Sequence, residues 1–331
     1  MVKFFFKYLF FFLFIPIFIT LTLDYLYSHF FLQKNPEKEY RIFHPVYHHT
    51  LKSNYYSDTA IYLDKIYSIC TDSRGFRFDC KSKELDKYDV AFIGDSFTEG
   101  VQLAYEYTFV DLIDKATNLK IVNLGVSSYS PAIYYHKVKN LLEKKILYFE
   151  HLVVFIDISD IQNDIIWKDC GDYVCEELLL GSTPFLVQLK TKLADSFPLH
   201  YRLYFKLKTI FFKTFHSERP TNFIIPDISP LDYNFELSAW TYNPNVGGYG
   251  EGGVEKAIQT AISNMEKLYN ILEKNGIKLS IAVYPWPGQI LHDTVNSQQV
   301  EIWFNFCEGK CFKFIKIRYH CCRINYSIFF I

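Results

Sequence analysis

The sequence lacks several patterns that would assign a function directly. It has no Cys-x-x-Cys motif, the spacing typical of zinc knuckles, and no Gly-Lys-Ser/Thr loop that would hold nucleotide phosphates. Its charge is nearly balanced, with 35 basic and 36 acidic residues, so nothing in the composition favours a nucleic-acid partner. We therefore expect no cofactor, no metal site and no nucleic-acid binding. Half of the 331 residues are apolar, which is enough for one sizeable core with an appendage.

The N-terminus carries a long apolar run. Residues 8–23 have no charge, and if Lys7 snorkels then residues 4–23 match the roughly 20 residues of a membrane-spanning helix. Lys3 and Lys7 favour a cytoplasmic N-terminus, and no small-x-small cleavage site follows the run. Residues 1–23 are therefore predicted to be an uncleaved signal anchor, with the rest of this single-pass membrane protein on the periplasmic or extracellular side. A removed signal peptide and a soluble protein with an apolar N-terminal helix are the alternatives.

The eight cysteines fit an exported domain. Six of them form close pairs separated by long cysteine-free stretches: Cys70 and Cys80, Cys170 and Cys175, Cys307 and Cys311. We predict local disulfide bonds rather than a zinc site. Cys321 and Cys322 are adjacent, and the sequence suggests no role for them.

The middle of the chain, residues 88–305, alternates β-type and helical patterns. Apolar strand-like runs are expected at residues 90–93, 120–124, 151–158 and 277–284, and helices at residues 108–116, 130–147 and 253–275. Such alternation predicts an α/β fold with a doubly wound parallel sheet, which is flavodoxin-like.

Two segments interrupt or precede this pattern. An insertion at about residues 165–252 ends in a glycine-rich stretch, which follows no strand and is predicted to be a flexible joint or lid. Residues 24–87 are polar and aromatic, and we expect a stalk or lead-in segment. Its cluster of His44, His48 and His49 could bind a metal, although a surface stalk or edge segment is the preferred interpretation.

Ser96 is the candidate nucleophile. The apolar run of residues 90–93 ends at Gly94, after which the chain reads Asp-Ser-Phe-Thr-Glu-Gly. Open α/β sheets present a nucleophile in this way, at the carboxyl edge of a buried strand. The alternative is a serine that only caps the next helix.

The order Gly-Asp-Ser-x-Thr resembles the first block of the SGNH (GDSL-type) hydrolases, a family of serine esterases and acyl-transfer enzymes. Asn-Leu-Gly at residues 123–125 resembles the second block, which implies that Gly125 donates its N–H group to the oxyanion. The family's third block, Gly-x-Asn-Asp, is altered here, and Ser159 and Asn163 are competing candidates for the oxyanion donor of its asparagine. Residues 72–77 occupy the place of an Asn-x-x-Gly-x-Arg segment in membrane-anchored members.

The family's last block, Asp-x-x-His, supplies the general base and is absent from this sequence. His292 is a weak substitute candidate for the base. The atypical tail, residues 306–331, has no clear periodicity and reads like the product of a frame change or a truncation. Without a base, a serine nucleophile loses on the order of 10⁴-fold in rate.

The resemblance implies a membrane-anchored serine esterase or acyl-transfer enzyme of SGNH type. Its expected substrates are acylated envelope glycans or lipid esters, and loss of the Asp/His block would impair it. The main alternative is a non-catalytic SGNH-like protein of envelope assembly or binding. An unrelated binding protein with a flavodoxin-like sheet and a defective fragment are further alternatives.

Overall fold

The computed structural model divides the chain into two compact units. Unit 1 comprises Met1–Pro36 with Glu177–Thr221, and unit 2 comprises Glu37–Glu176 with Asn222–Ile331. The residues that the structure describes are 12, 14–30, 40–62, 65–167, 196–197, 199–200, 203–204, 207, 239–241, 246, 249, 252–286, 289 and 297–317. Several predictions fall outside these residues: those for His292, for the Cys170 and Cys175 pair, for Cys321 and Cys322, and for most of the insertion.

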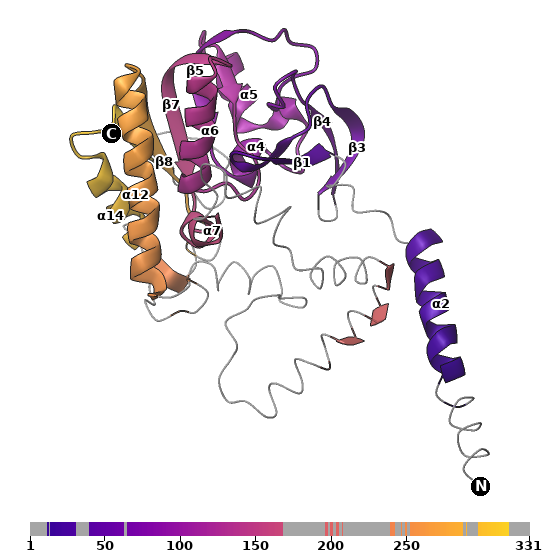
Figure 1. Ribbon diagram of the computed structural model, residues 1–331. Coiled ribbons are helices and arrows are strands. Elements are labelled where there is room, and N and C mark those ends of the chain that lie inside the picture. Colours follow the sequence, from indigo (N-terminus) through magenta and orange to yellow (C-terminus); the bar gives the residue numbers. More distant parts are fainter. Residues whose placement is uncertain are drawn as a thin grey trace, which may run out of the picture. The chain divides into compact units, whose positions relative to one another are not determined.

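Unit 2 is built around a five-stranded parallel sheet (Figure 1). Its strands are β5 (Lys87–Ile93), β6 (Ile121–Asn123), β7 (Tyr148–Ile156), β8 (Lys278–Val283) and β9 (Lys313–Lys316). They lie in the order β6-β5-β7-β8-β9. Numbered along the chain, this is the 2-1-3-4-5 order of flavodoxin-type sheets. The predicted α/β class with a parallel sheet is confirmed.

Side chains along the central strands alternate between two hydrophobic cores. Ala91 and Ile93 face the larger core, whereas Val90 and Phe92 face the smaller one. The larger core is covered by α6 (Pro131–Glu143), α12 (Gly253–Lys274) and α14 (Gln298–Cys307), and the smaller one by α5 (Phe109–Ala116). A parallel sheet needs this cover on both faces because its strands are apolar on both sides. The remaining short helices are α4 (Ser96–Glu99), η2 (Tyr105–Tyr107), α7 (Asp160–Trp167) and η4 (Ala239–Thr241).

The lead-in segment differs from the expected stalk. It forms two antiparallel pairs, β1 (Arg41–His44) with β2 (His48–Leu51) and β3 (Tyr56–Tyr62) with β4 (Lys65–Cys70). Leu51, Ile69 and Phe76 are buried in the same core as the sheet, so the segment from Glu37 onward belongs to unit 2. Ala60 on β3 and Tyr67 on β4 join the same core, whereas Ile42 and Phe43 on β1 are exposed.

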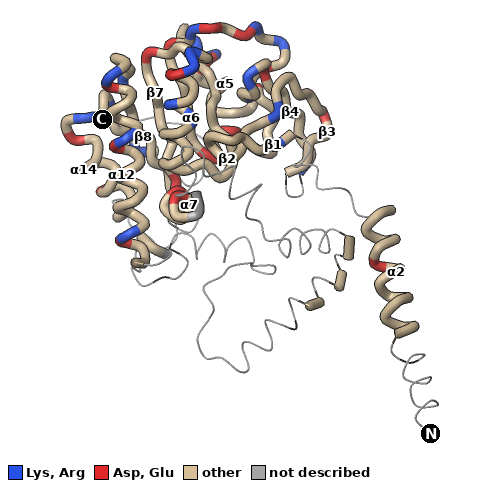
Figure 2. Tube along the Cα trace, viewed as in Figure 1, with Lys and Arg blue, Asp and Glu red and all other residues tan. Residues whose placement is uncertain are grey.

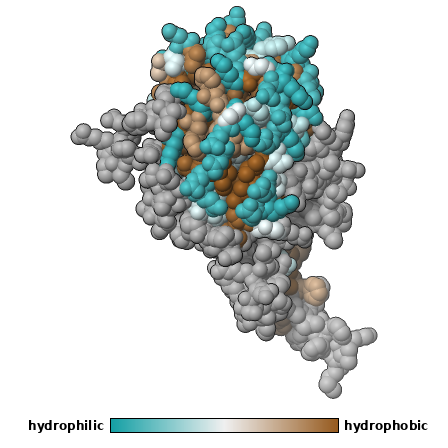
Figure 3. Space-filling model, turned by 90° about the vertical axis from the view of Figure 1, so that its left-hand side faces the viewer, coloured by the Kyte–Doolittle hydropathy of each residue, from teal (hydrophilic) through white to brown (hydrophobic). Residues whose placement is uncertain are grey.

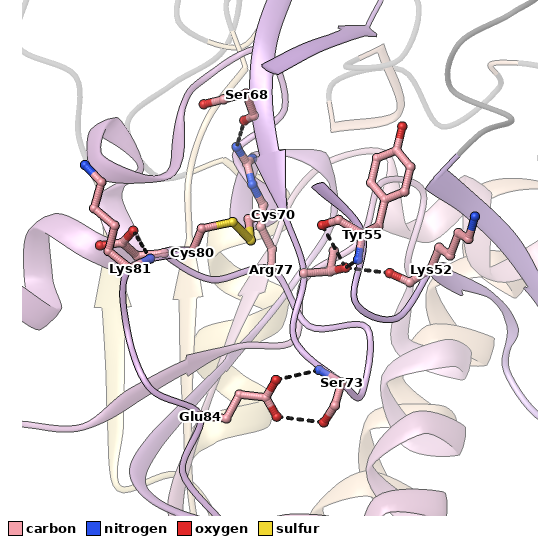
Figure 4. Close-up of a disulfide and its surroundings, with 11 residues drawn as sticks. Lys52, Tyr55, Ser68, Cys70, Ser73, Arg77, Cys80, Lys81 and Glu84 are labelled. Atoms are coloured by element: carbon pink, nitrogen blue, oxygen red, sulfur yellow. Dashed lines mark hydrogen bonds between the residues drawn. A yellow bond between two sulfur atoms is a disulfide. The ribbon is translucent and has the colours of Figure 1, made fainter. Parts of the chain in front are cut away.

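Two of the predicted cysteine pairs are disulfide bonds. Cys70 is bonded to Cys80, and Cys307 to Cys311. Figure 4 shows the first of these beside a turn in which Ser73 donates from its backbone N–H and its hydroxyl to the Glu84 carboxylate. The disulfide closes the loop that leads from β4 toward β5.

The C-terminal tail begins inside the sheet. Residues 313–316, expected to be part of an atypical tail, form the edge strand β9, which pairs with β8. Phe314 packs against the larger core and Ile315 against the smaller one. A strand of this length carries too few residues for its alternation to be recognised without the neighbouring strand.

Unit 1 contains the helix α2 (Ile15–Phe30). Its buried Asp24 accepts hydrogen bonds from the backbone N–H groups of Leu199 and His200. Most of the predicted signal anchor precedes the described part of α2, and among the described residues no helix is long and apolar enough to span a bilayer.

Basic and acidic residues occur on the same elements, for example along α12 (Figure 2). On the face shown in Figure 3, hydrophilic residues surround a small apolar area.

Candidate active site

The carboxyl ends of four neighbouring strands bring polar side chains to one edge of the sheet. Asp95 and Ser96 follow β5, Asn123 ends β6, Asp157 follows β7 and Tyr284 follows β8. Because the strands are parallel, these ends meet at the same edge. Asp95 and Asp157 flank the point between β5 and β7 where the chain changes direction across the sheet, the usual ligand-binding position of open α/β sheets.

Ser96 begins the short helix α4, directly after a tight turn. A Cβ atom on Gly94 would lie 2.2 Å from Thr98 Oγ1 and 2.9 Å from the Phe155 carbonyl oxygen, so only glycine fits at the turn. Asp95 caps α4 by accepting the Phe97 N–H at 2.9 Å. Ser96 is half-buried, and its hydroxyl donates to Asp95 Oδ2 at 3.2 Å. The predicted nucleophile is therefore accessible, and it lies against a carboxyl group.

Asp95 and Asp157 form a buried carboxyl pair. The Tyr284 hydroxyl lies 2.8 Å from Asp95 Oδ1 and 3.3 Å from Asp157 Oδ2, and Trp286 Nε1–H donates to Asp157 Oδ2 at 2.9 Å. Burial raises the pKa of Asp95 well above its usual value, and the neighbouring charge and hydrogen bond of Asp157 raise it further. The buried position therefore favours the protonated form of Asp95 more strongly than water does.

The two candidates from the altered third block lie together where β7 leads into α7. Asp157 Oδ1 accepts from the Ser159 backbone N–H at 2.6 Å and from the Ser159 hydroxyl at 2.7 Å. Asn163, one helical turn further on, has its amide nitrogen 3.4 Å from Ser159 Oγ. In this arrangement the Ser159 hydroxyl is directed to Asp157, so a role as oxyanion donor would require it to rotate. Both residues remain candidates.

Asp160 is a third buried carboxyl group close enough to Asp95 and Asp157 to interact with them electrostatically. One of its oxygens accepts from the Tyr134 hydroxyl at 2.9 Å, and the other, Oδ1, has no partner in the described part of the chain. Burial raises the pKa of Asp160 well above its usual value, and the charges of Asp157 and Asp95 add to this effect. Burial thus favours the protonated form of Asp160 as well.

Gly125 lies in the loop after β6 and packs directly on α4. A Cβ atom there would lie 2.7 Å from Thr98 Cβ and 2.8 Å from the Glu99 nitrogen. The Gly125 N–H donates to Asn123 Oδ1 at 2.9 Å. Close approach to α4 therefore explains the glycine. Its predicted role as oxyanion donor requires the bond to Asn123 to open.

The segment at residues 72–77 supports the end of α4. Asp72 Oδ1 accepts from the backbone N–H groups of Arg74 and Phe76, which shapes the turn. Arg77 is fully buried, and its guanidinium group donates to backbone carbonyl oxygens at and after the end of the helix, those of Glu99, Gly100 and Leu103. This arginine fixes where α4 ends.

The general base is not located among the described residues. Within them, no histidine is hydrogen-bonded to Ser96, whose hydroxyl is bonded to Asp95. His292 lies outside the described residues. The cluster of His44, His48 and His49 forms no group that could hold a metal ion among the residues described.

The sequence interpretation assigned no role to Glu99 or to Ser128, in the loop after β6. It also did not predict that Tyr284 and Trp286 donate to Asp157. Glu99 is fully buried and bonded to the loop after β6. Ser128 is exposed at the tip of that loop with a φ of 66°, a left-handed conformation uncommon for a residue with a side chain. The acidic residue one position after Ser-x-Thr was visible in the sequence, but its partners are distant along the chain.

No protein-family model matches the chain, and no curated protein matches it. Among solved structures, the chain is similar to AlinE4, an SGNH-hydrolase family esterase. The TM-score is 0.31 and the identity 13%, over 69% of this chain and 75% of that chain. This is a distant structural resemblance, so the function has to be argued from the residues of the site.

Proposed function

We propose that the chain is a serine-dependent esterase or acyl-transfer enzyme in which Ser96 is the nucleophile. The observation that carries this proposal is the place of the Ser96 hydroxyl. It is half-buried rather than sealed, at the carboxyl end of a central parallel strand, and it is bonded to a carboxyl group. This is the edge of an α/β sheet at which a bound acyl group would be expected.

The reaction follows from the residues around that hydroxyl. Ser96 Oγ attacks the acyl carbon while its proton passes to a base, and the oxyanion forms near the start of α4. The leaving alcohol takes up a proton, and the acyl group on Ser96 is then transferred to water or to another hydroxyl. Gly125, with Ser159 or Asn163, remains the candidate oxyanion donor set, and His292 remains the candidate base.

The substrate class follows from the predicted location. An exported domain tethered to a membrane meets acylated glycans and lipid esters of the cell envelope. We propose these as the substrates, with the lipid bilayer as the partner of the N-terminal helix. The disulfide bonds Cys70–Cys80 and Cys307–Cys311 support a domain outside the cytoplasm.

A fluorophosphonate probe tests the nucleophile, because it forms a covalent bond only with an activated serine. The full-length chain should be labelled, and Ser96→Ala should abolish the label. The exposed Ser82 provides a matched control, and Ser82→Ala should be labelled like the wild type. Labelling that persists in Ser96→Ala would remove Ser96 from its role.

A second function, a non-catalytic binding protein of the same fold, is favoured by one specific observation. The Gly125 N–H and the Ser159 hydroxyl are both bonded within the protein, to Asn123 and Asp157. A folded wild-type chain that resists the probe but binds an O-acetylated oligosaccharide in calorimetry would support this function over the enzyme.

A further inference from the structure

Ser127, in the loop after β6, has all of its polar groups held by other parts of unit 2. Its backbone N–H donates to Glu99 Oε2 at 2.7 Å, and its carbonyl oxygen accepts from His49 Nε2 at 2.7 Å. Its hydroxyl lies 3.1 Å from the Tyr62 hydroxyl. These partners come from α4, β2 and β3, so two strands of the lead-in segment and the helix that begins at Ser96 all bind the same residue.

Glu99 is the centre of this arrangement. Its side chain is fully buried, and Arg41 on β1 binds both carboxylate oxygens, at 2.8 and 2.9 Å. Such a two-point pair fixes the orientation of the carboxylate as well as its charge. Burial alone would lower the pKa of Arg41, but the Glu99 carboxylate raises it above its usual value, so Arg41 stays charged.

The loop that Glu99 holds is packed against the start of α4. Asn123 Nδ2 donates to the Thr98 carbonyl oxygen at 2.7 Å, and the Val126 N–H donates to the Gly94 carbonyl oxygen at 3.2 Å. Gly94 and Thr98 stand on either side of Ser96 in the chain. A shift of the loop would therefore move the surroundings of the nucleophile.

The histidine in this contact acts as a fixed donor. The Ser127 carbonyl can only accept, so His49 carries its hydrogen on Nε2 and its Nδ1 accepts from His48 Nδ1 at 2.8 Å. Burial lowers the pKa of His49 to about 3, so the ring stays neutral and keeps this tautomer at physiological pH. Together with Tyr129, whose hydroxyl donates to the His49 carbonyl oxygen at 2.8 Å, it joins β2 to the loop.

We propose that Glu99, held by Arg41, is a positioning residue that fixes the Ser127–Ser128 turn beside Ser96. The lead-in strands β1 to β3 then support one side of the active site and are not a spacer between the N-terminal helix and the domain. This inference rests on the proposed function for its catalytic consequence. The hydrogen bonds that hold the loop do not depend on that function.

The test compares Glu99→Gln, Arg41→Lys and Tyr62→Phe with the full-length wild-type chain. Tyr56→Phe is the matched control, because Tyr56 lies on the same strand as Tyr62 but is exposed. Four quantities are measured: the rate of fluorophosphonate labelling, kcat and KM for p-nitrophenyl acetate, and hydrogen exchange of the peptide covering residues 124–130. Melting temperatures and exchange of the β7 peptide show whether each variant is folded.

If the inference holds, Glu99→Gln and Arg41→Lys lower kcat and the labelling rate roughly 10- to 100-fold, because a displacement of about 1 Å costs about 10²-fold. KM for the small ester stays unchanged. Exchange at residues 124–130 becomes faster while β7 stays protected. Tyr62→Phe, which removes a single contact, gives a smaller loss in the same direction, and Tyr56→Phe behaves like the wild type.

The other outcomes separate the inference from the function. A labelled wild type with unchanged labelling and exchange in Glu99→Gln and Arg41→Lys overturns the positioning role and leaves the enzyme in place. An unlabelled wild type refutes the proposed function. The exchange data then test the positioning role of Glu99 by themselves: faster exchange at residues 124–130 in the variants supports it, and unchanged exchange overturns it. If Glu99→Gln fails to fold, Arg41→Lys and Tyr62→Phe carry the same comparison.

Discussion

Lys137 on α6 offers the sharpest test of the packing around the site. It is fully buried, and its ammonium group donates to the Leu124 carbonyl oxygen at 2.9 Å and to the Tyr129 hydroxyl at 3.2 Å. Its Nζ also lies 4.8 Å from the centre of the Tyr129 ring. Burial lowers the pKa of Lys137 from 10.5 to about 7, although the charges of Asp72 and Glu99 oppose this shift.

The direction and size of the effect on stability follow from this shift. Between pH 7 and pH 10.5 the unfolded chain binds a proton at Lys137 that the folded chain does not, so stability rises with pH across this window. The slope is about 1.4 kcal/mol per pH unit, and it flattens below the folded pKa. Lys137→Met removes the ionisable group. The free energy of unfolding of the wild type relative to this variant should therefore increase by about 2 kcal/mol between pH 7 and pH 9.

Urea unfolding of the full-length chains in mild detergent, followed by tryptophan fluorescence at pH 6, 7, 8 and 9, measures this difference. Lys144→Met, at the exposed end of the same helix, is the matched control, and its difference from the wild type should stay constant with pH. A difference between wild type and Lys137→Met that is flat from pH 7 to pH 9 would refute the reasoning, since Lys137 would then carry its charge inside the fold.

Three further predictions concern His49, the Cys70–Cys80 disulfide and Asp160. His49→Gln keeps a donor for the Ser127 carbonyl but removes a ring whose pKa burial lowers from 6.5 to about 3. The wild type should lose about 2 kcal/mol of stability relative to this variant between pH 7 and pH 5, because its unfolded chain alone takes up the proton. Cys70→Ser with Cys80→Ser opens a loop with a sequence separation of 10 and should lower the free energy of unfolding by about 3 kcal/mol. Asp160→Asn should gain stability over the wild type as pH rises above 3.8, by about 1.4 kcal/mol per unit, because the folded wild type must keep a proton that the unfolded chain releases.

Denaturant unfolding over the stated pH range checks the first and third of these predictions, and unfolding at one pH checks the second. Equal acid sensitivity of His49→Gln and wild type would show that His49 is not buried as a neutral ring. An unchanged midpoint in the double serine variant would mean that the disulfide adds nothing to stability. An Asp160→Asn variant whose advantage does not grow with pH would place the ionised form of Asp160 in the folded protein.

The main elements of the sheet could be predicted because each is a local pattern. The run at residues 151–158 was expected as a strand and matches β7 (Tyr148–Ile156), since a strand buried on both faces is apolar at consecutive positions. The expected helix at residues 253–275 matches α12 (Gly253–Lys274), whose length makes its periodicity clear. The pairs β1–β2 and β3–β4 and the edge strand β9 were not expected, because short half-exposed strands are stable only against a partner.

The residues of the site also include some that the sequence could identify and some that it could not. Ser96 and the turn at Gly94 could be identified from a single stretch of sequence. The roles of Glu99 and Asp157 could not, because their partners are far along the chain: Arg41 lies 58 residues from Glu99, and Trp286 lies 129 residues from Asp157. Nothing in the local sequence distinguishes such a carboxylate from an exposed one.

Periodicity and turn chemistry act over a few residues, and they determined the class of the fold, the strand that carries Ser96 and the sharp bend that presents it. Burial and hydrogen bonding are properties of the assembled domain. Only the tertiary structure decided that the lead-in strands hold the loop after β6, that the Gly125 N–H is bonded to Asn123, and that Asp95 is buried next to Asp157. Groups that are ordinary in water acquire their charge state and their role when the fold removes water and brings distant partners together.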